Sequence, residues 1–269
     1  MSADFFSHFL DHQLATQTKS IQAYHPENQK VWLKKASKRH ACWIYVPLRL
    51  VSKMLGLHLL TPIPNLGGEK AIACEVARIR QLKKLGIRVP EILASRRDAV
   101  LLKDAAPMGQ TVQQLEQALS AQTNQTDRLA LLHKAVDALQ HLHDQKGYLS
   151  EGFARNILVD EQQQIAFIDF ETDPRKYLSL KDCQTRDWLY FIFSTGYRLE
   201  EQDLSTASQY IVTALSQQLE QLQAICRVGR KLHWVLKLKP ENLGSDGRRM
   251  TKCIRLLQLL DQHDPLPMI

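Results

Sequence analysis

The sequence predicts an α+β protein in two lobes, a small β-rich lobe followed by a larger helical one. Short segments with strand-like alternation lie mostly in the first part of the chain, and long segments with helical periodicity lie mostly in the second. A length of 269 residues suits one bilobal unit or two small domains. Because periodicity is lost after residue 104, we place the lobes at residues 1–104 and 105–269.

The first lobe contains four strand-like segments and one helix. Segments 20–24 and 30–34 flank a turn-like His-Pro-Glu-Asn sequence, and segments 89–93 and 99–103 predict two further strands. A helix precedes the second pair and ends at the capping residue Gly86. Its apolar stripe consists of Ile72, Val76, Ile79, Leu82 and Leu85.

The second lobe is predicted to be helical apart from one hairpin. The hairpin has its strands at 157–159 and 165–170, separated by a polar turn. The expected helices cover residues 111–119, 127–143, 186–193, 201–225 and 248–261.

Composition restricts the class of partner. The formal charge of +7 and the pI near 9.1 favour an anionic partner, such as a nucleotide, phospholipid head groups or an acidic glycolipid. No motif that reads nucleic acid is present, so we expect no nucleic-acid partner. The five cysteines are scattered without a CxxC pair, which argues against a zinc site or a disulfide framework. We expect neither a secretory signal nor a membrane-spanning segment.

The hairpin brings two oxygen-bearing side chains together. A turn centred on residue 162 or 163 places Asn156, just before the first strand, opposite Asp169 at the end of the second. An amide oxygen beside a carboxylate suits Mg²⁺, which retains phosphate oxygens and water as its other ligands. The alternative is an Asn that caps a turn and an Asp that ends a strand.

A second pair predicts an ion pair between a strand and a helix. Glu75 lies on the apolar stripe of its helix, where a carboxylate is costly unless a cation meets it. Lys34, near the end of a strand, is the preferred cation, and Lys35 is the competing candidate. In the alternative interpretation, Glu75 reaches solvent at the margin of the helix.

Five segments in this order resemble the protein-kinase-like superfamily, and in particular the bacterial lipopolysaccharide kinases of the Kdo and heptose kinase family. The resemblance covers roughly residues 30–193 and implies the bilobal protein-kinase-like fold. The segments are Val-Trp-Leu-Lys at 31–34, Glu75 with Leu-Gly-Ile-Arg-Val-Pro at 85–90, Leu-Gln-His-Leu-His at 139–143, Gly-Phe-Ala-Arg-Asn-Ile-Leu-Val at 152–159 and Phe-Ile-Asp-Phe-Glu at 167–171.

The resemblance implies a role for each matching residue. Lys34 would contact the α- and β-phosphates of ATP, and Glu75 would orient it. Asn156 and Asp169 would hold Mg²⁺, with Asp169 bridging the phosphates. Asp187 would be the buried carboxylate that braces the catalytic loop, whereas a plain acid at a helix start is the alternative.

The same resemblance implies an adenine site at the connection between the lobes. The stretch Leu-Lys-Asp-Ala at 102–105 would be the hinge, with Lys103, Asp104 and Ala105 next to the base. In this family pattern the backbone of the hinge binds the adenine by hydrogen bonds.

Two positions depart from the family pattern. The catalytic base is expected five residues before the metal-binding Asn, where this chain has Glu151, and Leu149 replaces the usual His two residues earlier. Arg155 would supply the positive charge of the loop or act as a structural partner. No glycine occurs before Gly56, so the hairpin of residues 20–34 is no Gly-rich phosphate-covering loop.

A basic amphipathic insert is predicted at residues 38–60. Its cations alternate with aromatic and aliphatic residues, as in helices that lie in a membrane interface, but an extra helix on the small lobe is the alternative. A second basic region contains Arg227, Arg230, Lys231, Lys237, Lys239, Arg248 and Arg249. We interpret most of these charges as solvated surface.

The sequence therefore predicts an ATP- and Mg²⁺-dependent phosphotransferase that acts on a hydroxyl of an anionic sugar in lipopolysaccharide core or a precursor. By the resemblance, it would work in the cytoplasm, at the inner membrane surface of a Gram-negative bacterium. One alternative is a catalytically inactive kinase-like binding or regulatory module. Another is an atypical kinase for proteins or small molecules.

Overall fold

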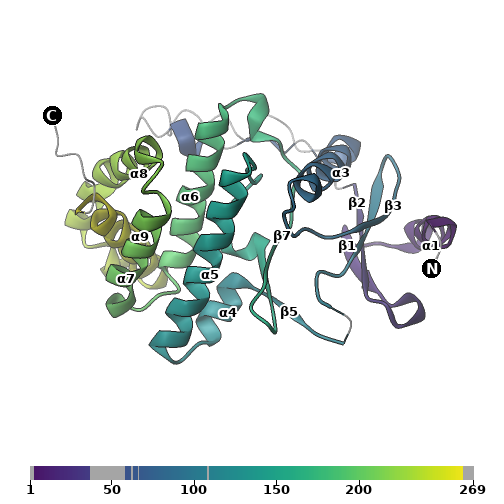
Figure 1. The fold of residues 1–269 in the computed structure, drawn as a ribbon, viewed down its shortest axis with the longest axis horizontal. Helices are drawn as coiled ribbons and strands as arrows, with labels where there is room; N and C mark the ends of the chain where they lie inside the picture. Colours follow the sequence, from purple (N-terminus) through teal and green to yellow (C-terminus); the bar gives the residue numbers. More distant parts are fainter. Residues whose placement is uncertain (1–2, 37–57, 62, 66, 108, 263–269) are drawn as a thin grey trace.

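The computed structural model describes residues 3–36, 58–61, 63–65, 67–107 and 109–262. It has the predicted α+β fold in two lobes, with β-sheets concentrated in the N-terminal part and helices in the larger C-terminal part. Figure 1 shows the four-stranded sheet at one end of the molecule and the helices α7, α8 and α9 at the other. Most of the predicted basic insert lies outside the described residues; its last three residues form the short 3₁₀ helix η3 (His58–Leu60).

The first sheet has the antiparallel order β1-β2-β4-β3. The predictions for β1 (Ile21–Tyr24), β2 (Val31–Lys35) and β4 (Ala99–Lys103) are confirmed, and η1 (Pro26–Asn28) forms the first turn. Strand β3 (Ile92–Ser95) begins later than predicted. Residues 89–91 are not part of the strand: Pro90 has no N–H to donate, and only the backbone oxygen of Glu91 accepts from the Lys103 N–H of β4.

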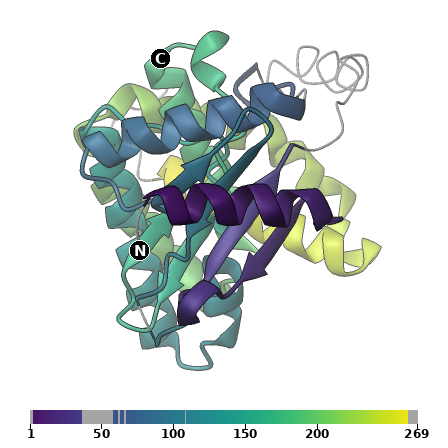
Figure 2. The ribbon, with the colours of Figure 1, turned by 90° about the vertical axis from the view of Figure 1, so that its right-hand side faces the viewer.

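Helices cover both faces of this sheet (Figure 2). Val31 and Leu33 of β2 pack on one face against α1 (Ala3–Thr16), whereas Trp32 and Lys34 point to the opposite face. That opposite face carries α3 (Gly68–Lys84), which confirms the predicted helix, and Gly86 follows it with φ +76°. The alternation of β2 thus directs Lys34 toward α3.

Helix α1 was not predicted from the sequence. Its buried side chains are Phe6 and Leu10, which share a cluster with Leu33 and Leu101 of the sheet. The four-residue spacing of these two apolar residues is the helical signal. Without this helix, the outer face of β2 would be open to water.

The second sheet has the order β5-β6-β7. The predicted hairpin is present as β6 (Ile157–Asp160) and β7 (Ile165–Phe167), with Ile157 opposite Phe167. The prediction of a helix at 111–119 was wrong, because Val112–Gln114 forms strand β5 and only Leu115–Ala121 forms helix α4. The free edge of β6 supplies hydrogen-bond partners that override local helix propensity.

The remaining elements are mainly helical. The predicted helix at 201–225 is in fact divided by a turn at 215–218, which lets α7 pack on α5 and α9 while α8 packs on α6 and α9. The bounds are α5 Gln125–Asp144, η4 Ala154–Asn156, η5 Pro174–Lys176, α6 Leu180–Gly196, η6 Glu201–Asp203, α7 Leu204–Ala214, α8 Leu219–Leu232, η7 His233–Leu238, η8 Pro240–Leu243 and α9 Ser245–Gln262.

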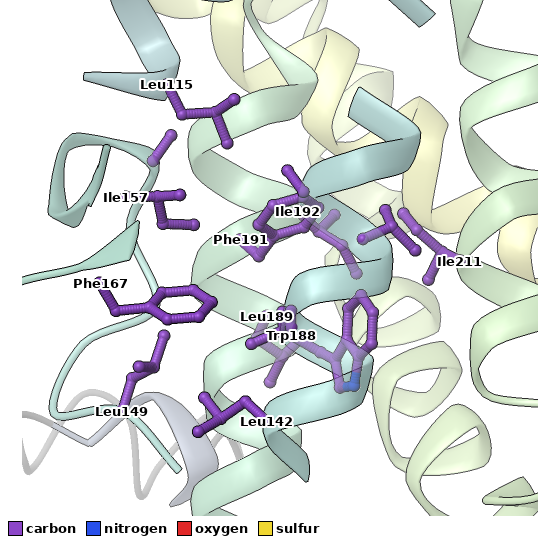
Figure 3. Packing of buried hydrophobic residues seen from close by; sticks show 14 of the residues in the cluster. Leu115, Leu142, Leu149, Ile157, Phe167, Trp188, Leu189, Phe191, Ile192 and Ile211 are labelled. Atoms are coloured by element: carbon purple, nitrogen blue, oxygen red, sulfur yellow. The ribbon is translucent and has the colours of Figure 1, made fainter. Parts of the chain in front are cut away.

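The core of the helical lobe centres on α6. Trp188 and Phe191 of this helix are fully buried, and Ile157 and Phe167 of the hairpin pack toward them (Figure 3). Burial of side chains of this size stabilises by roughly 1.5–3 kcal/mol each. The hairpin is therefore anchored to a rigid helix. Within the described ranges, no helix has the length and apolar character needed to cross a membrane.

Candidate active site

Lys34 and Glu75 meet between the sheet and helix α3. Lys34 Nζ lies 2.9 Å from Glu75 Oε2, and the Glu75 side chain is 2% exposed. Glu75 therefore faces the interior and does not reach solvent at the helix margin. Lys35, the competing candidate, donates instead to the backbone oxygen of Gln17, 2.5 Å away.

Two further carboxylates contact the same ammonium group. Lys34 Nζ lies 3.0 Å from Asp169 Oδ1 and 2.8 Å from Glu171 Oε1. Three carboxylates around one cation leave an excess of negative charge when all are ionised. This excess attracts a further cation, such as the divalent ion that accompanies a nucleotide.

Burial and the ion pairs shift the pKa values of Lys34 and Glu75. Burial by itself lowers the pKa of Lys34, but the three carboxylates outweigh it and raise the pKa above its ordinary value. Burial raises the pKa of Glu75, and Lys34 offsets only part of that rise. Lys34 is thus held as an ammonium ion at every physiological pH.

The hairpin places Asn156 and Asp169 beside this cluster. The N–H of Ile168 donates to the backbone oxygen of Asn156, so the register puts Ile168 opposite Asn156. Asp169 therefore lies one residue further along the chain than expected. Asp169 has φ +69°, a left-handed conformation that Asp tolerates better than most residues. This backbone turn brings its carboxylate to Lys34.

The donor set fits a magnesium ion bound together with phosphates. Asn156 Nδ2 donates to the Glu151 carbonyl at 3.2 Å, which leaves the amide oxygen for another partner. The Asp169 side chain is 41% exposed. Within the described part of the chain, no group of three or more His, Cys, Asp or Glu could hold a metal on its own. One or two protein oxygens completed by phosphates and water are what Mg²⁺ commonly takes.

Asp187 holds the loop that precedes the hairpin. Its Oδ2 accepts from the Leu149 N–H at 2.7 Å and lies 3.2 Å from His143 Nε2. Burial raises the pKa of Asp187, although the His143 and Leu149 contacts oppose the rise. Helix α6 begins at Leu180, so Asp187 lies in its interior, and the alternative of an acid at a helix start was wrong.

Glu151 lies on this loop, at the place of the expected base. Its Oε2 accepts from Arg155 at 3.2 Å, and Arg155 lies over the Phe153 ring, 4.3 Å from the centroid. Burial raises the pKa of Glu151, Arg155 lowers it, and Asp169 raises it further. Arg155 is therefore positioned to lower the pKa of Glu151.

The hinge residues are more engaged within the chain than expected. The N–H groups of Lys103 and Asp104 donate to the backbone oxygens of Glu91 and Lys30, so neither is left to donate to an adenine. Arg88 donates to the Ala105 oxygen at 3.1 Å. Of these three residues, Ala105 is the one whose N–H has no such partner among the described contacts.

The carboxylate of Asp104 ties the hinge to β2. It accepts from Trp32 Nε1 at 2.7 Å and from the Ala106 N–H at 2.8 Å, and it pairs with Lys30 at 3.0 Å. Burial alone would raise the pKa of Asp104, but these three contacts outweigh burial and lower it. Asp104 thus sets the position of the hinge relative to the strand that carries Lys34.

Sequence reasoning missed two residues that connect the site, Glu171 and Arg78. Glu171 contacts Lys34 and accepts from Asn65 Nδ2 at 2.5 Å. Arg78, one turn after Glu75, donates to the Tyr148 backbone oxygen and covers the Tyr148 ring. No periodic pattern pointed to Glu171, because residues 168–171 lie beyond the end of β7 and Asp169 has φ +69°, so the alternation of a strand does not apply there.

The carboxylates around Lys34, together with Asn156, Arg155 and the hinge residues, line one cleft between the lobes, with a volume of ≈ 680 Å³. Glu151 and Asp187 are not among its lining residues. Trp32, Lys34 and Leu102 line it from the first sheet, and Leu158, Ile168 and Asp169 line it from the hairpin region. Ser20 and Ile21, at the start of β1, line it where a Gly-rich loop would be expected. A junction between a helix and a strand therefore takes the place of that loop.

The fold and the site together define a protein of the kinase-like class: a β-rich lobe and a helical lobe with a strand Lys, a helix Glu and an Asn–Asp hairpin at one cleft. The model of the lipopolysaccharide kinase (Kdo/WaaP) family matches residues 63–207, more than half of the chain. This chain belongs to that family. Membership supports a kinase-like phosphotransferase. A search among curated proteins finds no match.

Gly152 tests whether the loop depends on close contact with α6. A Cβ added there would lie 2.5 Å from the Asp187 carbonyl oxygen and 2.9 Å from its Cα. We expect Gly152→Ala to lower the free energy of unfolding in urea by about 1–3 kcal/mol, the range of overpacking costs.

Gly196→Ala is the control, because Gly196 lies at the end of α6 and its added Cβ would meet nothing closer than the Leu256 side chain of α9, at 3.4 Å. We expect it to be neutral or to stabilise by up to about 1 kcal/mol through helix propensity. Equal destabilisation by the two variants would contradict the account of the loop.

Proposed function

We propose that this protein transfers the γ-phosphoryl group of ATP to a hydroxyl of an anionic sugar in lipopolysaccharide core or a related glycolipid. The observation that carries the proposal is the contact of the Lys34 ammonium with Glu75 of α3 and Asp169 of the hairpin region. Strand, helix and hairpin come from distant parts of the sequence and converge on one cleft. That convergence is what a phosphate-binding lysine requires.

The cleft divides into an apolar part and a charged part. Leu102, Leu158 and Ile168 provide apolar surfaces from both lobes, which suit the flat faces of an adenine. Lys34 lies at the charged part, where it would contact the α- and β-phosphates. Positioning supplies most of the catalysis in phosphoryl transfer, and in the proposed mode this division would orient the γ-phosphate toward the loop of Glu151.

Residues of this chain would accept the proton of the sugar hydroxyl and would hold the ion that neutralises the phosphate charge. Glu151 would accept the proton of the attacking sugar hydroxyl as its oxygen bonds to the γ-phosphorus and the bond to the β–γ bridging oxygen breaks, releasing ADP. Asn156 and Asp169 would hold Mg²⁺, which neutralises phosphate charge when bound. Arg155 would keep Glu151 ionised.

The acceptor and the location rest on charge and family. The net charge of +7 favours an anionic acceptor, and the family is that of lipopolysaccharide kinases. We propose work in the cytoplasm, peripheral to the inner membrane, where such acceptors are built. The expected membrane contact of the insert at 38–60 concerns residues that are mostly outside the described ranges.

A catalytically inactive binding module is the second candidate. Its support is the junction of α1 and β1 in place of a Gly-rich loop, together with the Glu151 base, which is one methylene longer than an aspartate. Such a module would bind the nucleotide without transfer.

Asp169→Asn tests the assigned metal and phosphate site. We expect transfer of labelled phosphate from ATP to a lipid extract of the host to fall by a factor of about 100, the scale of losing one preorganised charge-stabilising group. Asp137→Asn, on the exposed face of α5, is the control and keeps full transfer. Undiminished transfer by Asp169→Asn would refute the site. A thermal shift with Mg-ATP but no transfer to any acceptor would support the binding module.

The pH profile tests Glu151 as the base. A base must be ionised, and burial raises the pKa of Glu151, so kcat/KM should rise with pH through a limb above the ordinary glutamate range. Arg155→Gln removes the charge that lowers this pKa, so the limb should move to higher pH. Arg155→Lys should restore it toward the wild-type position. A limb that stays in place in Arg155→Gln would exclude this role for Glu151.

A further inference from the structure

Apolar side chains gather on the surface around η7 and η8. Of the seven large hydrophobic residues that are exposed in the described ranges, four lie in this stretch: Trp234 is 52% exposed, Leu238 65%, Leu243 75% and Met250 41%. We call these four residues, with the cations around them, the η7–η8 surface. Apolar patches of this kind mark interaction sites more often than isolated apolar residues do.

Close packing holds these residues on one part of the molecule. Lys239, with φ +50°, joins η7 directly to η8. A Cβ at Gly247 of α9 would meet the Pro240 carbonyl and the Leu243 side chain. Helix α9 therefore packs so closely on η8 that only glycine fits at position 247. Met250 follows Gly247 by three residues and lies on the same side of the helix. The His233 ring of η7 bonds to Gln258 of α9.

The same stretch is basic, although three of its cations form ion pairs within the chain: Arg230 with Asp261, Arg249 with Asp246 and Lys252 with Glu200. Residues 227–252 contain eight Lys and Arg against two Asp and Glu, whereas the whole chain has a net charge of +7. Lys237 and Lys239 flank Leu238, and all three are exposed. Figure 1 places α8 and α9 at the end of the molecule away from the four-stranded sheet, so this charge is separate from the cleft.

We propose that the η7–η8 surface docks on an anionic phospholipid membrane. A Trp and aliphatic tips can enter the interface between head groups and acyl chains, because the indole ring suits that boundary. The charged ends of the flanking Lys and Arg side chains then contact the lipid phosphates, while their aliphatic stems lie against apolar surface. A second copy of this chain fits less well, because two surfaces of the same positive charge repel.

This surface is a tether that is distinct from the cleft. It concentrates the protein at a membrane and contributes no residue to phosphoryl transfer. Docking therefore does not depend on the proposed phosphoryl transfer; its failure would count against the proposed location at the inner membrane and would leave the proposed transfer intact. The vesicles of the test contain no lipopolysaccharide, so an acceptor bound in the cleft cannot produce the signal.

Flotation of the full chain with vesicles tests the tether. We expect the protein to float with phosphatidylcholine vesicles that contain phosphatidylglycerol, to float much less with phosphatidylcholine alone, and to lose binding as salt rises. Each Lys or Arg near an anionic surface is worth about a fivefold factor in partitioning. Lys237→Glu with Lys239→Glu should therefore reduce binding by at least about tenfold. Trp234→Ser with Leu238→Ser should reduce it by a similar factor.

Matched controls separate the surface from total charge and total hydrophobicity. Lys70→Glu with Lys84→Glu makes the same charge change on exposed positions of α3, and Leu219→Ser removes another exposed apolar side chain; both should retain binding within about threefold. Far-UV circular dichroism checks that each variant is folded.

Three results would overturn the proposal. The first is a wild-type protein that does not float with anionic vesicles. The second is equal loss of binding in the α3 control and the η7–η8 variants. The third is self-association in sedimentation velocity that Trp234→Ser abolishes, without vesicle binding, which would assign the surface to a second copy.

Discussion

The contact between one buried ammonium group and carboxylates from two directions is the interaction on which the site depends. Lys34 comes from β2, Glu75 from α3, and Asp169 from the end of the hairpin. Burial of the Glu75 carboxylate is costly unless a cation meets it, so β2 and α3 are constrained to the arrangement in which Lys34 and Glu75 meet. Asp169, whose side chain is 41% exposed, adds the contact from the other lobe. Arg78 strengthens this constraint, because it joins the helix of Glu75 to the backbone of the loop before the hairpin, at Tyr148.

The helical lobe provides the rigid side of the cleft. The hairpin packs through Ile157 and Phe167 on α6, and the same helix supplies Asp187, which fixes the backbone at Leu149. Arg186 of α6 also donates to the backbone oxygens of Leu59 and Thr61, at 3.0 and 2.7 Å. One helix thus positions the hairpin, the loop before it and the segment that leads into α3. The hinge is set separately, by Asp104 against Trp32.

Much of this arrangement was predictable from the sequence, because it follows from periodicity and local turn chemistry. The two lobes, β2, β4, α3 and the hairpin were found in this way. That a cation meets Glu75 followed from an acid on an apolar stripe, whereas the choice of Lys34 over Lys35 followed from the resemblance to the kinase pattern. Strand β5 was missed because its conformation is decided by the free edge of β6, a partner distant in sequence. Glu171 was missed because only the three-dimensional turn at Asp169 brings it to Lys34.

The excess of carboxylates around Lys34 offers the most direct test of the central claim. Binding of Mn²⁺, followed by electron paramagnetic resonance of the free ion, and binding of Mg-ATP, followed by calorimetry, can be compared in the wild type and in Lys34→Met. The account predicts opposite changes: the variant binds the bare ion more tightly, because a repelling charge is gone, and Mg-ATP more weakly, because the phosphates lose their cation. Unchanged affinities, or affinities that move in the same direction, would contradict it.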